Sequence, residues 1–134
     1  YWPTHLEIEF VAGPFNRCTK YVVSSNENLA LPWEHSELIT GDAVAKLKEL
    51  KASDGPMLQV HGSGNLVQSL LKNDMVDELW LKIFPLTLGT GKKLFAEGTI
   101  PAAFEMTESA ITSNGVIFAN YKRAGDVTTG TIGE

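Results

Sequence analysis

A short glycine-rich segment carries the pattern with the clearest chemical meaning in this sequence. It reads Gly62-Ser63-Gly64-Asn65-Leu66-Val67, one residue away from the G-x-G-x-x-G pattern of dinucleotide-binding turns. Such a turn, placed before a helix, leaves backbone N–H groups unpaired at the positive end of the helix, where phosphate binds. Glycines in many turns serve only to allow close packing. The segment therefore predicts an anion-binding turn, with a purely structural turn as the alternative.

The other residues that could do chemistry give weaker signals. Gly89-Thr90-Gly91-Lys92 lacks the spacing and the Ser/Thr of a P-loop, so we expect a bare loop or a ligand contact. His61 is a candidate for hydrogen bonding or proton transfer, although a lone His is more often structural. Cys18 has no accompanying base and is expected to be a half-buried filler. The acidic cluster of Asp74, Asp77 and Glu78 is expected to be a solvated turn. No spacing suggests a metal site, and no nucleophile–histidine set is present.

A strand, a helix and a second strand are expected to position the glycine turn. Met57-Leu58-Gln59-Val60 is typical of a short buried strand, and Leu66 to Asn73 is amphipathic. Val76 to Pro85 gives a second strand signal. Such a βαβ unit normally has parallel strands and a right-handed crossover. No acidic residue follows at the Rossmann distance, which falls near Lys82-Ile83, so a Rossmann domain is disfavoured.

The flanking sequence predicts further helices and strands. The expected elements are a helix within His5–Asn16, strands at Lys20–Ser24 and Ser36–Thr40, and a helix from the N-cap Asp42 to Ser53. Phe104–Thr112 and Val116–Arg123 alternate around Ser113-Asn114-Gly115, which predicts an antiparallel hairpin. Together these elements predict an α/β domain with a mixed sheet.

Composition limits the class of protein. The chain has 134 residues, enough for one domain, and a net charge of −5. Its longest basic run is Lys92-Lys93, so nucleic-acid binding is disfavoured. One cysteine excludes an intramolecular disulfide, and no apolar run has the length of a membrane span. We therefore expect a cytoplasmic protein that binds neither nucleic acid nor membrane.

Three segments, taken together, resemble the dihydrofolate reductase-like superfamily. They are Lys20–Ser24, Leu58–Leu66, and the stretch from Val76 through Leu88-Gly89-Thr90-Gly91 to Leu94-Phe95. The resemblance is in particular to the reductase (C-terminal) domain of bacterial riboflavin biosynthesis and its small stand-alone bacterial relatives. It implies a three-layer αβα fold whose mixed, mainly parallel sheet ends in an antiparallel hairpin. It also implies a single domain over residues 1–125, without the family's N-terminal strand region, and a flexible tail over 126–134.

The resemblance also implies an activity and a site. Members transfer hydride from NADPH to a small heterocyclic or carbonyl substrate, as do dihydrofolate reductase and 5-amino-6-(5-phosphoribosylamino)uracil reductase. The implied cofactor-binding residues are Ser24, Ser25, Gly62, Ser63, Gly64, Asn65 and Leu66. The implied substrate-side residues are His61, Phe84, Pro85, Leu88 and Gly89. The proton donor would precede the matched segments and is not named. The family habit implies a homodimer.

Two features leave alternatives open. Ser25-Asn26-Glu27 stands where many members have Arg, so the choice between NADPH and NADH is open. The Gly62–Ser63 bond matches a place where dihydrofolate reductases have a cis Gly-Gly bond, and a cis bond before Ser would be costly. The alternative function is a nucleotide-binding module of the same fold without catalytic activity.

Overall fold

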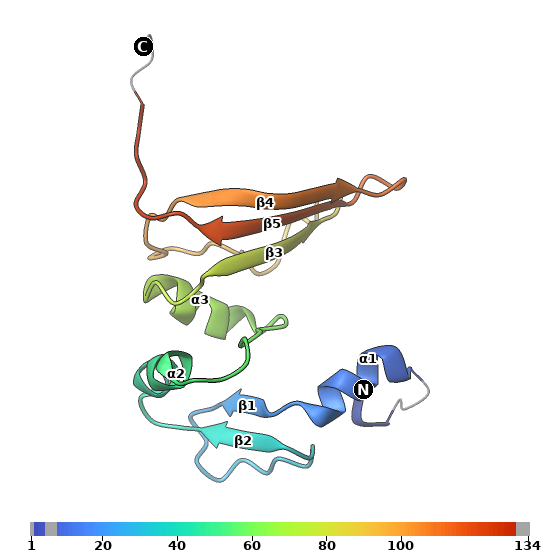
Figure 1. Cartoon of the computed structure of the whole chain (residues 1–134), viewed down its shortest axis with the longest axis vertical. Coiled ribbons are helices and arrows are strands. Elements are labelled where there is room, and N and C mark those ends of the chain that lie inside the picture. The colour runs from blue at the N-terminus through green and yellow to red at the C-terminus, as the bar shows by residue number, and fades with distance from the viewer. Residues whose placement is uncertain (1, 5–7, 131–134) are drawn as a thin grey trace. The chain divides into compact units, whose positions relative to one another are not determined.

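A computed structural model describes residues 2–4 and 8–130 of the chain. Helices and strands occur in both halves of the chain. The chain divides into two units, Tyr1–Met57 and Leu58–Glu134. The first unit contains η1 (Trp2–Thr4), α1 (Glu9–Arg17), β1 (Lys20–Val23), β2 (Ser36–Ile39) and α2 (Ala43–Ala52) (Figure 1). The second contains α3 (Gly64–Lys72), β3 (Glu78–Ile83), β4 (Phe104–Ile111) and β5 (Ile117–Arg123).

The first unit is built on a parallel strand pair. β1 and β2 run from the pair Lys20↔Ser36 to the pair Val23↔Ile39, so both predicted strands are confirmed. Asp42 caps α2 as predicted, because its Oδ1 accepts a hydrogen bond from the Ala45 N–H at 3.0 Å. Parallel pairing therefore occurs here, next to a regular capped helix.

The N-terminal helix prediction is confirmed over the described part of its segment. α1 covers Glu9–Arg17, whereas residues 5–7 lie outside the described residues. The prediction for Cys18 was wrong, because this thiol is exposed and donates to the Phe15 carbonyl at 3.4 Å. Cys18 follows the last helical residue, so it lies at the helix end, away from packed side chains.

The second unit contains a three-stranded antiparallel sheet in the order β3-β5-β4. β4 and β5 form the predicted hairpin, which is confirmed (Figure 1). The Gly115 N–H donates to the Thr112 carbonyl at 2.9 Å, and Gly115 has a φ of +79°. A type I turn followed by a left-handed glycine is a common three-residue hairpin loop, so Gly115 has a conformational role here.

The predicted βαβ unit was wrong. Met57-Leu58-Gln59-Val60 belongs to no strand, and Met57 and Val60 are 62% and 43% exposed. β3 pairs antiparallel with β5, from Glu78↔Lys122 to Ile83↔Ile117. An apolar run predicts an extended segment, but it becomes a strand only when another strand satisfies its backbone groups. The helix and the second strand of the unit are confirmed.

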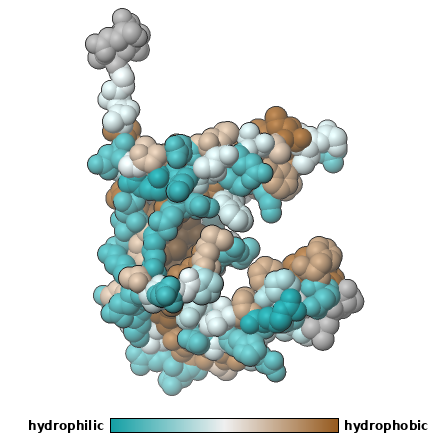
Figure 2. All heavy atoms as spheres, in the orientation of Figure 1, coloured by the Kyte–Doolittle hydropathy of each residue, from teal (hydrophilic) through white to brown (hydrophobic). Residues whose placement is uncertain are grey.

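The buried core of the described chain is small. Its buried apolar side chains are Ala12 and Ile39 in the first unit and Leu71, Leu79 and Ala119 in the second. Cross-strand pairing places Ile83, Ile117 and Ile111 in one row across the second sheet, 48%, 39% and 73% exposed. Figure 2 shows apolar atoms near this end of the hairpin. The second sheet therefore leaves apolar surface accessible within its own unit.

The architecture is mixed α/β, as expected, but with a different balance of strand pairing. The sheet of the second unit is wholly antiparallel, so the expectation of a mainly parallel sheet is not met there. The three-layer arrangement and the single domain over 1–125 stay predictions. Of the tail over 126–134, residues 131–134 lie outside the described residues. Within the described part, no helix combines the length and apolar character needed to cross a membrane.

Candidate functional site

The glycine turn ends in two residues with left-handed backbone, directly before α3. Gly62 has a φ of +74° and Ser63 a φ of +49°. No side chain caps the helix, and its first backbone bond runs from the Val67 N–H to the Ser63 carbonyl at 3.0 Å. The N–H groups of the first turn have no partner within the helix. They point toward the positive end of the helix dipole, so the turn can receive an anion.

The turn leaves room for a ligand to approach its backbone. A Cβ atom added at Gly62 would meet no heavy atom within 4 Å. None of the described residues has a cis peptide bond, so the Gly62–Ser63 bond is trans. Asn65 is exposed and Leu66 half-buried in the first turn of α3. Five of the predicted cofactor-binding residues, Gly62 to Leu66, therefore do form one continuous turn and helix start.

A loop lies along one side of α3. A Cβ atom at Gly64 would be 3.3 Å from the Lys92 Cδ, and one at Gly98 would be 3.0 Å from the Lys72 Cε. Between these two contacts, the side chain of Gln68 holds the loop. Gly64, Gln68 and Lys72 are four residues apart and therefore share one helix face. We call the segment 92–98 the α3-side loop.

The Gln68 amide group is the central anchor of the α3-side loop. Its Nε2 donates to the carbonyls of Lys93 and Leu94 at 3.2 and 2.6 Å, and its Oε1 accepts from the Ala96 N–H at 3.0 Å. An amide has both donors and an acceptor, so one side chain can hold three backbone groups within a four-residue stretch of this loop. The loop is thereby fixed beside the helix.

Lys92 brings a cationic side chain to the start of α3, close to the glycine turn. Its aliphatic stem lies against Gly64, and the residue is exposed. A long cationic side chain can keep its stem on a surface and its ammonium in water. Neither Lys92 nor Gln68 was among the predicted site residues. The lysine that follows Gly89-Thr90-Gly91 was the available signal for Lys92, whereas nothing in the sequence distinguishes Gln68.

The predicted substrate-side residues lie in two places. His61 is exposed beside the glycine turn, with its Nε2 3.1 Å from the Gln59 Oε1. Phe84 and Pro85 follow β3, and the Leu86 N–H donates to the Phe84 carbonyl at 2.8 Å. This i to i+2 bond makes a tight turn at the end of the strand.

The loop after this turn is apolar and accessible. Phe84 is 58% exposed and Leu88 80% exposed. Pro85 lies beside the hairpin turn, since a Cβ atom at Gly115 would be 3.5 Å from its Cγ. Gly89 has a φ of +73°. Only two residues separate Gly89 from Lys92. Because the Lys92 side chain lies against Gly64, this loop is connected to the glycine turn.

Ser24 and Ser25 lie in the first unit, at the end of β1. The Ser24 Oγ accepts from the Asn26 N–H at 3.0 Å, and its own N–H donates to the Ile39 carbonyl at 3.0 Å. Ser25 is exposed. They follow β1 at the carboxyl end of a parallel strand, and both their role and their proximity to the glycine turn stay predictions.

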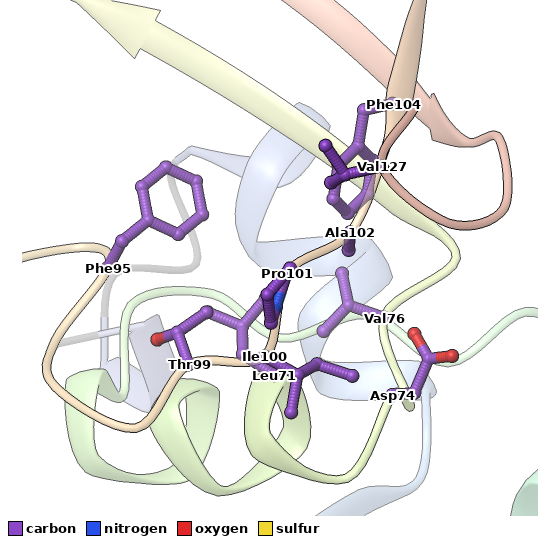
Figure 3. A pocket seen from close by; sticks show the side chains of 10 residues that line it. All are labelled: Leu71, Asp74, Val76, Phe95, Thr99, Ile100, Pro101, Ala102, Phe104 and Val127. Carbon is purple, nitrogen blue, oxygen red and sulfur yellow. The ribbon is translucent and has the colours of Figure 1, made fainter. Parts of the chain in front are cut away.

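The second unit also contains a cavity of about 430 Å³ near the other end of α3 (Figure 3). Its walls include Leu71 on α3, Phe95 and Thr99 from the loop, Phe104 on β4, and Val127 after β5. No residue of the predicted site lines it. The cavity and the glycine turn are therefore separate features of this unit.

The acidic side chain in the wall of this cavity, Asp74, belongs to an ion pair. The Arg123 Nε donates to the Asp74 Oδ1 at 2.8 Å and its Nη2 to Oδ2 at 3.2 Å. Hydrogen bonding to Asp74 raises the pKa of Arg123 above its ordinary value. The Arg123 N–H also donates to the Asp77 carbonyl at 2.7 Å. Asp74 and Asp77 thus have structural partners at this junction and are not only a solvated turn.

Metal binding finds no support within the described residues 2–4 and 8–130. No group of three or more His, Cys, Asp or Glu side chains there is arranged to hold a metal ion. The accessible features of the second unit are consequently the uncapped helix start, the lysine beside it and the apolar loop.

These features define an α/β protein with a glycine turn suited to a phosphate-bearing ligand. The RibD C-terminal domain model matches residues 4–118. The chain therefore belongs to the RibD C-terminal domain family, in agreement with the resemblance noted from the sequence.

Individual relatives agree with this assignment. Uncharacterized protein YwjB of Bacillus subtilis (strain 168) is 30% identical over 95 residues, which cover 71% of this chain and 54% of that protein. Uncharacterized protein YyaP of the same organism is 28% identical over 102 residues, covering 76% and 53%. The chain spans about half the length of these curated relatives.

A solved structure extends the likeness to the fold. The chain resembles a protein from Shewanella sp. PV-4 that is provisionally assigned to riboflavin biosynthesis, with a TM-score of 0.66 and 25% identity. The match covers 90% of this chain and 71% of that one. The likeness therefore includes residues from both units.

Proposed function

We propose that this protein is a reductase that binds NADPH and reduces a small heterocyclic or carbonyl substrate. The observation that carries the proposal is the uncapped start of α3 behind Gly62 and Ser63, with Lys92 beside it. Membership of the RibD C-terminal domain family supports a reductase-like role related to riboflavin biosynthesis.

The residues of the turn fit a dinucleotide. The free space at Gly62 lets a pyrophosphate approach the backbone, and the N–H groups of Gly64, Asn65 and Leu66 are the donors that would hold it. Lys92 would balance its negative charge. In the same proposal, Ser24 and Ser25 bind the adenosine ribose and its phosphate through their hydroxyl groups.

The apolar loop after β3 would form the substrate side. When bound, NADPH supplies the hydride. Phe84, Pro85 and Leu88 would exclude water from the reacting centre, while Gly89 would let the backbone approach the substrate. His61 would orient the substrate by hydrogen bonding from beside the glycine turn. A homodimer with one such site per chain completes the proposal.

A charge substitution at the turn separates binding from stability. Aspartate at position 63 tolerates the left-handed backbone and favours a helix N-terminus, but its charge would repel a pyrophosphate. We expect Ser63→Asp to keep or raise the melting temperature and to weaken NADPH binding at least about tenfold. Fluorescence titration of the full chain with NADPH and NADH measures this effect. Ser63→Asn is the matched uncharged control.

The two adjacent lysines offer a second matched pair. Lys92→Glu should weaken binding, whereas Lys93→Glu should change it far less, because the contact with Gly64 belongs to Lys92. Equal affinity of the wild type and Ser63→Asp would refute the turn as the phosphate site. NADPH binding without oxidation by dihydrofolate, aminopyrimidine or small carbonyl substrates would favour the binding-module alternative.

A further inference from the structure

The sheet of the second unit has two edges, and β3 forms one of them (Figure 1). Among residues 2–4 and 8–130, β3 pairs with β5 and with no other strand. A strand edge presents backbone N–H and C=O groups that a further strand can bind, and proteins usually protect it with a bulge, a proline or charged side chains. β3 runs from Glu78 to Ile83 in an unbroken register and contains no proline.

The register of β3 on β5 shows which backbone groups point toward the outer edge. The Arg123 N–H donates to the Asp77 carbonyl at 2.7 Å, and these two residues lie opposite each other in the register of the two strands. In an antiparallel pair, hydrogen-bonded and non-hydrogen-bonded residue pairs alternate. Glu78, Trp80 and Lys82 therefore belong to the non-hydrogen-bonded pairs, and their N–H and C=O groups point away from β5.

The side chains of the same three residues are exposed and include both signs of charge. Trp80 is 60% exposed, and Glu78 and Lys82 are exposed on the same face of the sheet. The Trp80 Nε1 donates to the Glu78 Oε2 at 2.9 Å, which holds the indole beside the carboxylate. A carboxylate accepts several hydrogen bonds, so Glu78 can also receive a cation. Along this edge, an acid, an indole and a base follow one another.

We propose that β3 pairs antiparallel with β3 of a second copy of this chain, with the two-fold axis at Trp80. In this register Trp80 lies opposite the partner's Trp80, and Glu78 lies opposite the partner's Lys82. All three outward-facing residues then form hydrogen-bonded pairs, each exchanging both of its N–H···O bonds. A lysine at an edge usually discourages pairing, but here it faces a carboxylate. The homodimer of the proposed function thereby gains a defined interface.

Other registers and the other edge of the sheet fit a second copy less well. Moving the axis by two residues places Glu78 against the partner's Glu78, or Lys82 against the partner's Lys82, so like charges meet. β4, the other edge, contains Glu105 and Glu108 and no basic residue. Its register on β5 also shifts between Met106 and Glu108, and such an irregularity protects an edge from pairing. The sequence of the two edges therefore favours β3.

Sedimentation velocity on the full chain tests the association, at concentrations from about 5 to about 500 μM. A thiol reductant keeps the exposed Cys18 from linking two copies. We expect a reversible dimer with a Kd on the order of 10–100 μM, because an edge contact buries little area. Amide hydrogen exchange at Trp80 should slow as the dimer forms, whereas the Leu79 and Leu81 amides, already bonded to β5, should change far less. NADPH is absent, so the result does not depend on the proposed reductase activity.

Charge variants test the register. Lys82→Glu should weaken dimerisation at least about tenfold, because carboxylates then face each other across the interface. The double variant Glu78→Lys/Lys82→Glu restores opposite charges and should recover the wild-type Kd, and Glu105→Lys on β4 is the matched control that should leave it unchanged.

Three results would overturn the proposal. They are a monomer at about 500 μM, a dimer that does not respond to Lys82→Glu, and a dimer that the double variant fails to restore. A monomer whose Trp80 amide is already protected would also overturn it, because another segment of the chain would then cover the edge. Should Lys82→Glu fail to fold, the concentration dependence of Trp80 exchange in the wild type decides alone.

Discussion

Removing the Gln68 side chain tests how the α3-side loop is held. In Gln68→Ala the carbonyls of Lys93 and Leu94 and the N–H of Ala96 all lose their partner. A typical intramolecular hydrogen bond contributes about 0.5–1.5 kcal/mol net. These groups regain water when the loop opens, so we expect a total loss of about 1–3 kcal/mol in the free energy of unfolding.

Two measurements separate a local from a global effect. Urea unfolding gives the overall change, and hydrogen exchange at the Ala96 amide reports the loop itself. In Gln68→Ala this amide should exchange much faster, while amides of the β4–β5 hairpin keep their relative protection. NADPH affinity should also fall, because the loop carries Lys92 to the start of α3.

Two further variants act as controls for this prediction. Ser69→Ala changes the next residue, whose hydroxyl makes only a 3.3 Å bond to the Asn65 carbonyl, and should be close to neutral. Gln68→Glu keeps an acceptor for Ala96 but places a carboxylate against two carbonyls, so it should destabilise at least as much as Gln68→Ala. Unchanged exchange of the Ala96 amide in Gln68→Ala would refute the anchoring role.

Substitutions at three other residues test the packing, capping and turn geometry of individual elements. Leu71→Ala should cost about 2–5 kcal/mol in urea unfolding, because Leu71 is only 6% exposed; a loss below 1 kcal/mol would mean that its surroundings collapse freely. Asp42→Ala should cost about 1 kcal/mol and Asp42→Ser much less, so equal losses would argue against side-chain capping of α2. Gly115→Ala should cost about 1 kcal/mol or more, given the φ of +79°. A neutral result in thermal unfolding would contradict the need for a glycine in the hairpin turn.

Local signals predicted the elements well. The Asn114-Gly115 pair predicted the hairpin, Asp42 predicted the start of α2, and the glycine turn predicted the start of α3. Each of these signals acts through backbone geometry within a few residues, and a single sequence records such effects directly.

Pairing and side-chain anchoring were the parts that could not be predicted. An apolar run such as Met57–Val60 does not show which strand, if any, will pair with its backbone N–H and C=O groups. Likewise, the sequence of β3 did not show that it would pair antiparallel with β5. The resemblance gave the family correctly, and the glycine turn does precede a helix, but no strand directly precedes it. The role of Gln68 depends on a loop 25 to 28 residues away, so no local pattern could show it.

The α3-side loop also constrains the order of folding. Three of its backbone groups, the Lys93 and Leu94 carbonyls and the Ala96 N–H, bond to a side chain on α3 rather than to another strand, so these bonds cannot form until the helix exists. Closing the segment between Gln68 and its partners, which lie 25 to 28 residues away, costs conformational entropy before any of these bonds forms. The loop should therefore order after the folding barrier, and substitutions within it should speed unfolding while leaving the folding rate nearly unchanged. The part of the chain that carries Lys92 would then be the last to form and the first to open.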